Sequence, residues 1–167
     1  MPVKSSRRHE SLVPLSREHQ YGLLLCLRIH RGLPGGRDDE AWVRRKAAQA
    51  ARFVASDLAA HFRAEEESLF PAMRDFIEAT ELLNELVSEH RKLEALAGRL
   101  CAPEVGQVVE ALGEFADLLE SHIRKEEREL FPIYERLVSL DVAAEVSRSI
   151  RSIIGEAMQP KEPELLK

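Results

Sequence analysis

The sequence predicts an all-α protein, an antiparallel up-down four-helix bundle with a short additional C-terminal helix. Two observations carry this prediction. Apolar residues recur at helical spacing in four long segments, and the helix-forming residues Ala, Leu, Glu and Arg dominate the composition. Strand and hairpin formers are scarce, since the 167 residues include a single threonine, Thr80, and a single asparagine, Asn84. This length suits one domain with a sizeable core.

Capping and breaking residues set the expected boundaries of the four long helices. Ser16 is a candidate N-cap for the first helix, which is expected to end at the Gly-Leu-Pro-Gly-Gly turn of residues 32–36. The second is expected to start near Asp38 or Asp39 and to end or bend at Pro71, because proline disrupts a helix interior. The other two are expected over about 80–100 and 103–131, the last stopped by Pro132.

A weaker apolar stripe after residue 140 predicts the additional helix, packed on the outside of the bundle. Its apolar positions are Val142, Val146, Ile150, Ile153 and Ala157. The expected organisation is therefore a flexible leader over residues 1–14, the bundle domain over 15–158 and a disordered tail over 159–167.

Composition and charge argue against several classes of protein. A formal net charge of −5 and a pI near 5.7 disfavour general affinity for nucleic acid or anionic membranes. Cys26 and Cys101 stand far apart in apolar helical contexts, which suggests neither a disulfide framework nor a thiolate metal site. The N-terminus lacks the apolar stretch of a signal peptide, and no apolar run approaches the roughly 18 residues of a membrane span. We therefore expect a soluble, cytoplasmic protein.

Each of the four long helices places a histidine among its inward-facing apolar positions. Polar residues avoid such positions unless they are paired or bind a metal. A solvated flank would explain one such histidine, but it is a poor explanation for four. The expected inward positions, helix by helix, are Leu15, His19, Leu23 and Cys26; Val54, Leu58, His61, Glu65 and Leu69; Leu83, Leu86, His90, Leu93 and Ala97; and Leu112, Phe115, Leu119, His122 and Glu126.

An internal repeat is the most specific feature of the sequence. The segments HFRAEEESLFP (61–71) and HIRKEERELFP (122–132) both fit the pattern H-x-x-x-E-E-x-x-L-F-P. Residues four apart lie on one face of a helix, so the histidine and first glutamate of each copy offer an imidazole and a carboxylate to one point. Unpartnered buried carboxylates are costly, and a cation removes the penalty. Imidazole and carboxylate donors without thiolate suit iron, manganese or zinc. Phe70 and Phe131 are expected to wall the site.

Helix register predicts that these residues share one site. In antiparallel neighbours with short connections, His61, His90 and His122 fall at one level, because each lies ten residues from a helix end. His19 falls near His61, whereas His30 lies about 16 Å further along the axis and cannot share the site. Six donors exceed the needs of one tetrahedral zinc and favour two ions. The predicted ligands are His19 and His61 on one ion, His90 and His122 on the other, and Glu65 and Glu126 bridging both.

With these residues the chain resembles the hemerythrin family, in its HHE cation-binding branch, over roughly Leu15 to Tyr134. The resemblance implies a four-helix bundle holding two iron ions with an oxo or hydroxo bridge, and it assigns the ligand roles to the same six residues. Two positions depart from the oxygen-carrying hemerythrins. Their second histidine on the third helix is replaced by Glu94, and their aspartate five residues after the fourth-helix histidine is replaced by Glu127.

Several assignments remain open at this point. Coordination by Glu94, Glu66 or Glu127 is not decided, and a role outside the ligand set is favoured for each. His9 is assigned to the leader, His30 to the surface near the Gly-rich turn, and the two cysteines to core filling.

Three functions are compatible with such a centre. The favoured hypothesis is a di-iron protein that binds or senses oxygen, nitric oxide or redox or iron state, as the resemblance implies for this branch. The alternatives are a di-iron enzyme of the oxidase, peroxidase or nitric oxide reductase type, and a bundle whose metal serves stability alone. The expected partner is a small ligand such as oxygen or nitric oxide, with no nucleic acid and no membrane, and a homo-oligomer stays open.

Overall fold

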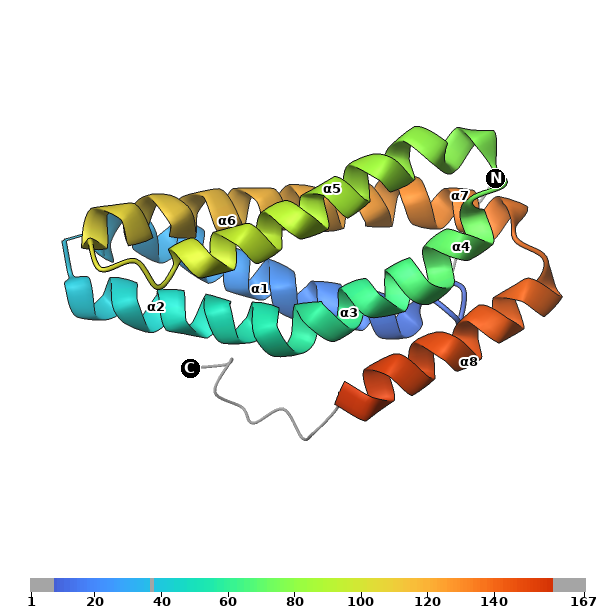
Figure 1. Cartoon of the computed structure of the whole chain (residues 1–167), viewed down its shortest axis with the longest axis horizontal. Coiled ribbons are helices and arrows are strands. Elements are labelled where there is room, and N and C mark those ends of the chain that lie inside the picture. The colour runs from blue at the N-terminus through green and yellow to red at the C-terminus, as the bar shows by residue number, and fades with distance from the viewer. Residues whose placement is uncertain (1–7, 37, 158–167) are drawn as a thin grey trace, which may run out of the picture.

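Four antiparallel helical rods form the body of the molecule, and a fifth helix lies across one end of them (Figure 1). The structure is a computed structural model that describes residues 8–36 and 38–157, with side chains described to residue 155. Within these residues it is all-α, as the sequence predicts. Three segments labelled η are π-helical turns, in which an N–H bonds to the carbonyl five residues earlier.

The rods follow the chain in order. They consist of α1 (Val13–Gly36); of α2 (Glu40–Phe53), η1 (Val54–Leu58), α3 (Ala59–Ala64), η2 (Glu65–Leu69) and α4 (Phe70–Met73); of α5 (Ile77–Arg99); and of α6 (Val105–Lys125), η3 (Glu126–Leu130) and α7 (Phe131–Leu137). The fifth helix is α8 (Leu140–Ala157), which packs against α3 and η2.

Several helix ends differ from the sequence prediction by a few residues. The N-cap of α2 is Asp39, as predicted, and its carboxylate accepts from the Trp42 N–H at 3.0 Å. The first helix begins at Val13 rather than Ser16 and continues through Pro34 to Gly36. The third rod begins at 77 instead of 80, and the fourth at 105 instead of 103.

Neither Pro71 nor Pro132 ends its helix, which corrects the stop predicted at Pro132 and, of the two outcomes predicted at Pro71, an end or a bend, the first. The second rod continues to Met73 and the fourth to residue 137. Proline has no N–H to donate, and its ring crowds the carbonyl four residues back in an α-helix. Each proline here follows a π-helical turn, in which the preceding Phe70 or Phe131 bonds to the carbonyl five residues earlier. The wider turn accommodates the proline, and the rod continues.

The packed part of the domain begins before residue 15. Residues 8–14 belong to the leader predicted from the sequence, yet Leu12 is fully buried and α1 starts at 13. His9 lies against Tyr134 and donates its backbone N–H to Glu135 at 2.9 Å. The tail predicted over 159–167 lies outside the described residues.

The outer helix α8 buries most of its predicted stripe. Val146, Ile150 and Ile153 are buried, as predicted. Val142 is exposed, and its neighbour Ala143 takes the inward position. The side chain of Ala157 is not among those described.

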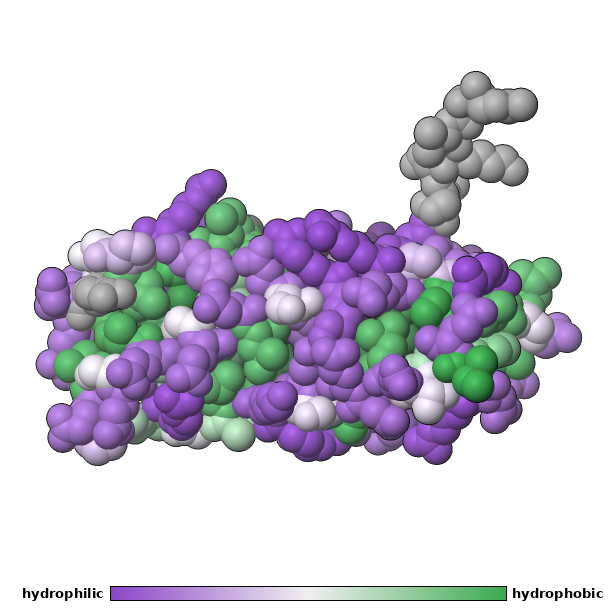
Figure 2. Space-filling model, turned by 90° about the horizontal axis from the view of Figure 1, so that it is seen from above, coloured by the Kyte–Doolittle hydropathy of each residue, from purple (hydrophilic) through white to green (hydrophobic). Residues whose placement is uncertain are grey.

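Two apolar clusters divide the core and leave a polar layer between them. One cluster includes Leu25, Phe53 and Leu119, and the other includes Leu86, Phe131 and Ile150. On the surface, polar residues predominate and apolar residues form separate patches, as one face shows in Figure 2. No helix of the described ranges is long and apolar enough to cross a membrane.

Candidate metal centre

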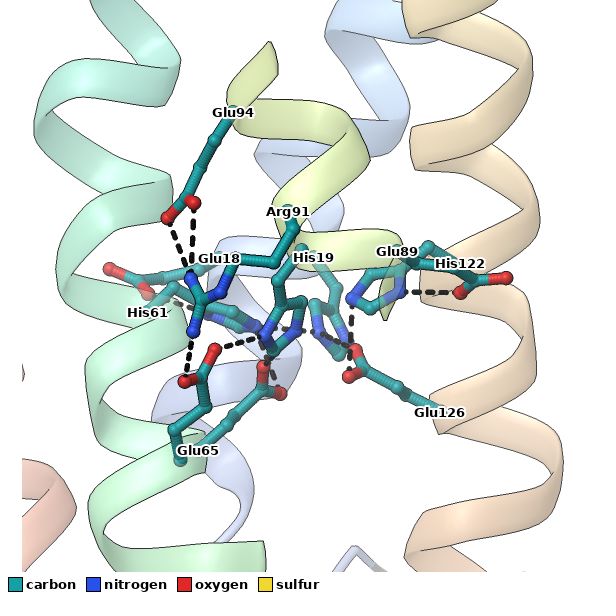
Figure 3. A network of polar contacts seen from close by, with 11 residues as sticks. Glu18, His19, His61, Glu65, Glu89, Arg91, Glu94, His122 and Glu126 are labelled. Atoms are coloured by element: carbon teal, nitrogen blue, oxygen red, sulfur yellow. Dashed lines mark hydrogen bonds and ion pairs between the residues drawn. The ribbon is translucent and has the colours of Figure 1, made fainter. Parts of the chain in front are cut away.

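The polar layer consists of the six side chains predicted from the sequence. Four helical rods supply them, each at a similar height, so that they point toward one another in the interior (Figure 3). None is more than 3% exposed. The six are His19 on α1, His61 on α3, Glu65 at the start of η2, His90 on α5, His122 on α6 and Glu126 at the start of η3.

The six side chains form two overlapping groups of four. One group is His19, His61, Glu65 and Glu126, and the other is Glu65, His90, His122 and Glu126. Within each group the potential ligand atoms lie within 4.8 Å of one another. This is the grouping that helix register predicts, with one histidine pair for each group and both glutamates shared.

Each shared carboxylate presents one oxygen to each group. Glu65 Oε1 lies 3.2 Å from His61 Nε2, and its Oε2 lies 3.3 Å from His90 Nε2. Glu126 Oε2 lies 3.1 Å from His19 Nε2, and its Oε1 lies 3.3 Å from His122 Nε2. Two donors about 2.1 Å from one ion are about 3.0 Å apart at right angles and about 3.4 Å apart at tetrahedral angles. The observed separations fall in this range.

Six of these buried polar atoms have no hydrogen-bond partner among the described residues. They are both carboxylate oxygens of Glu65, both of Glu126, and the Nε2 atoms of His90 and His122. Orphaned buried polar atoms are rare in proteins, because each one forfeits its hydration. A cation bound in each group satisfies them all, so the donor set fits a pair of metal ions.

The imidazoles and carboxylates of the centre stabilise each other's charged forms. Burial lowers the pKa of His122, but Glu126 and Glu89 outweigh it and raise that pKa to about 10. Burial raises the pKa of Glu126, but His122 and His19 outweigh it and bring it well below its ordinary range. The pKa of His61 is likewise raised well above its ordinary value by Glu65 and Glu18 against the effect of burial. A metal ion must displace these protons from the imidazoles in order to bind, so metal affinity should rise with pH.

A second layer of four glutamates, which we call the carboxylate ring, orients the histidines. Its members hydrogen-bond to the Nδ1 atoms: Glu18 to His61 at 2.9 Å, Glu66 to His90 at 2.7 Å, Glu89 to His122 at 2.8 Å and Glu127 to His19 at 2.8 Å. An ionised carboxylate only accepts, so each Nδ1 carries a proton, and the Nε2 of each imidazole is the nitrogen that faces the centre and would bind a metal ion after losing its own proton. Each glutamate comes from one rod and reaches the next rod around the bundle.

Aromatic rings enclose the imidazoles. Phe131 stacks on His19 with ring centroids 5.5 Å apart, and Phe70 stacks on His90 at 5.7 Å. Both were predicted as walls. Phe62, which sequence reasoning missed, also stacks on His90, with ring centroids 3.8 Å apart. Rings and apolar side chains keep water from the centre, which strengthens every charge interaction within it.

Comparison with known proteins agrees with this geometry. The family described as the hemerythrin HHE cation binding domain matches residues 13–134. The chain belongs to this family.

One curated relative was found by sequence. It is a protein of Nostoc sp. described as a DNA nickase, 33% identical over 81 residues, which make up 47% of this chain and 22% of that protein. The chain therefore spans less than a quarter of that relative's length. No solved structure matches the chain significantly.

The residues in which this member departs from the oxygen-carrying hemerythrins lie outside the group of donors that converge. Glu94 is on the surface, paired with Arg91 at 3.0 Å. Glu66 and Glu127 belong to the carboxylate ring. His30 is partly exposed and contacts Asp117 at 3.0 Å, away from the centre as predicted.

Two ring members, Glu18 and Glu89, were missed from the sequence. The signal is a second repeat, because each of these glutamates immediately precedes a histidine of the centre. The segments 15–19 and 86–90 both read Leu-x-x-Glu-His. The cysteines are free: Cys26 is buried, as predicted, whereas Cys101 is exposed, which corrects its assignment to core filling.

Proposed function

We propose that this chain is a non-haem di-iron protein that binds or senses a small ligand, oxygen or nitric oxide, or responds to redox state. His19, His61, Glu65, His90, His122 and Glu126 would hold the two ions. When bound, iron supplies reversible redox chemistry and vacant coordination positions for the ligand.

The observation that carries the proposal is the sharing of both carboxylates between two groups of donors. Each group offers two imidazole nitrogens and two carboxylate oxygens. Four donors complete a tetrahedral zinc and leave it closed, whereas they leave a six-coordinate iron with free positions. The donor set therefore supports a ligand-binding role with iron and a purely structural role with zinc.

Burial favours a diatomic ligand over a large substrate. The six donors are 3% exposed or less, and phenylalanine rings cover them. For the same reason we do not extend the nickase description of the Nostoc protein to this chain, since a DNA backbone could not reach the centre. The unpaired cysteines accord with the proposed cytoplasmic location.

Metal analysis and absorption spectra test the proposal together. The full chain is produced with ample iron, purified in air, and expected to hold about two irons with charge-transfer absorption from a bridged ferric pair. After anaerobic reduction, oxygen or nitric oxide should each change the spectrum. A chain with two zinc ions and no response to either gas would favour the structural role, and a chain that takes up no metal would refute the proposal.

A further inference from the structure

The guanidinium of Arg8 contacts the two side chains, Glu127 and Phe131, that hold His19 from outside the centre. Arg8 Nη2 lies 2.5 Å from Oε2 of Glu127, whose other oxygen accepts from His19 Nδ1 at 2.8 Å. The same guanidinium lies over the ring of Phe131, 5.0 Å from its centroid, and that ring stacks on His19. Arg8 thus fixes the hydrogen-bond partner and the stacking partner of one imidazole at once.

Arg8 is itself held in place by the residues around it. Its Nη1 lies 3.1 Å from Glu135 Oε1, which also accepts from the His9 N–H at 2.9 Å. Two residues further on, Ser11 Oγ lies 3.1 Å from the hydroxyl of Tyr134. The segment 8–12 therefore docks on α7 at several points, and it places Arg8 over the His19 side of the centre.

In the other half of the centre, the outer cations belong to the four rods themselves: Lys125 of α6 lies 2.5 Å from Oε1 of Glu89, the ring member that holds His122. Arg91 pairs with Glu66, the ring member that holds His90, but Arg91 is 54% exposed and divides its contacts between Glu66 and Glu94. His90 is stacked on Phe62 and Phe70, both of which come from the bundle itself. Arg8, by contrast, precedes the residues 13–134 that match the family. Arg8 and Arg91 thus contact equivalent glutamates of the carboxylate ring, but Arg91 is the more exposed of the two, and Arg8 also packs over Phe131.

We infer that Arg8 is a positioning residue for His19, and that through it the segment 8–12 sets how firmly the ion of the His19 and His61 group is held. The inference rests on the proposed two-ion centre. On this inference, residues outside the family domain control how tightly one of the two ions is held.

Iron release separates this role from a general effect of surface charge. Arg8→Gln and the matched control Arg91→Gln are loaded anaerobically with two equivalents of Fe²⁺, and transfer of iron to an excess chelator is followed. Loss of the carboxylate partner of a metal-bound histidine weakens metal binding by roughly 10- to 100-fold, and Arg8→Gln loosens this partner without removing it, so one of the two ions should leave up to about tenfold faster than in the wild type. In Arg91→Gln both ions should leave at the wild-type rates. Arg8→Lys, which can still pair with Glu127, should restore part of the difference.

A second readout does not need metal. In the metal-free protein, the imidazole NMR resonances of His19 should move in Arg8→Gln and those of His90 should not. Should Arg8→Gln fail to fold, Glu135→Gln removes the anchor of Arg8 and should give the same pattern with smaller size.

The outcomes are distinct. Fast release of one ion in Arg8→Gln alone supports the inference. Unchanged release, or equal acceleration in both arginine variants, overturns it while leaving the di-iron proposal intact. A wild-type chain that takes up no iron refutes the proposed function, and unchanged His19 resonances then overturn the positioning role as well.

Discussion

Replacing Glu126 by glutamine tests whether the two ions share their carboxylates. The two oxygens of Glu126 lie 3.1 and 3.3 Å from the Nε2 atoms of His19 and His122, which belong to different groups. A glutamine keeps the shape but loses the charge, and its amide offers one oxygen and one N–H₂ donor. Glu126→Gln should therefore weaken both ions, whereas His19→Gln should weaken the ion of one group.

The size of the effect follows from the ligand role. Losing a partner outside the ligand set costs roughly 10- to 100-fold in metal affinity, so losing a ligand itself, a carboxylate or an imidazole, should cost at least about 100-fold for each ion it serves. At a free metal concentration about ten times the wild-type Kd, each position is about 91% filled in the wild type and about 9% filled after that loss. The expected totals are about 1.8 ions per chain in the wild type, about 0.2 in Glu126→Gln and about 1.0 in His19→Gln.

Equilibrium dialysis against buffered Fe²⁺, followed by elemental analysis, measures these totals. Glu129→Gln is the matched control, because Glu129 lies on the same π-helical segment but is exposed, and it should retain the wild-type value. If Glu126→Gln lost a single ion, or lost none, its carboxylate would not bridge, and the two-group interpretation of the centre would be wrong.

Three further outcomes are expected. Glu89→Gln should weaken by roughly 10- to 100-fold the ion held by His122, and Glu18→Gln the ion held by His61, each measured by competition with a chelator. In the metal-free protein, the pKa of His122 is raised from 6.5 to about 10 and that of Glu127 is lowered from 4.5 to about 2. Because the charged forms stabilise the fold, urea unfolding should show greatest stability between pH 4.5 and 6.5. The stability from His122 should be lost as the pH rises toward 10, and the stability from Glu127 should be lost as the pH falls toward 2. A flat profile would contradict the charge pairing. Phe62→Ala should lower the free energy of unfolding by about 3–5 kcal/mol, against less than about 0.5 kcal/mol for the 89% exposed Ile77→Ala.

The donors of the centre could be predicted because the information is local. A histidine and a glutamate four residues apart share a helix face whatever the helix packs against, and the repeat places two such pairs at equal distances from a proline. The short turns of an up-down bundle then bring His19 and His90 to the same level.

The carboxylate ring could not be predicted in the same way, because its hydrogen bonds cross between rods. Glu18 reaches His61 and Glu89 reaches His122, contacts that depend on which helices are neighbours and how each is rotated. The sequence leaves coordination by Glu66 and Glu127 open, and it assigns Arg8 to the leader. The helix ends predicted at the prolines were wrong for another reason. The rule that proline ends a helix assumes α-helical hydrogen bonds, which the π-helical turns before these prolines do not have.

The two repeats also explain why the centre needs the whole bundle. The first half of the chain supplies His19, His61 and Glu65, and the second half supplies the corresponding residues of the other group. Each half thus brings both histidines of one ion but a single carboxylate, so neither half completes a set of four donors alone. Two of the ring contacts, from Glu66 to His90 and from Glu127 to His19, also cross between the halves. Metal binding and the docking of the two halves are therefore expected to be coupled, because each ion is completed by, and oriented through, residues of the opposite half.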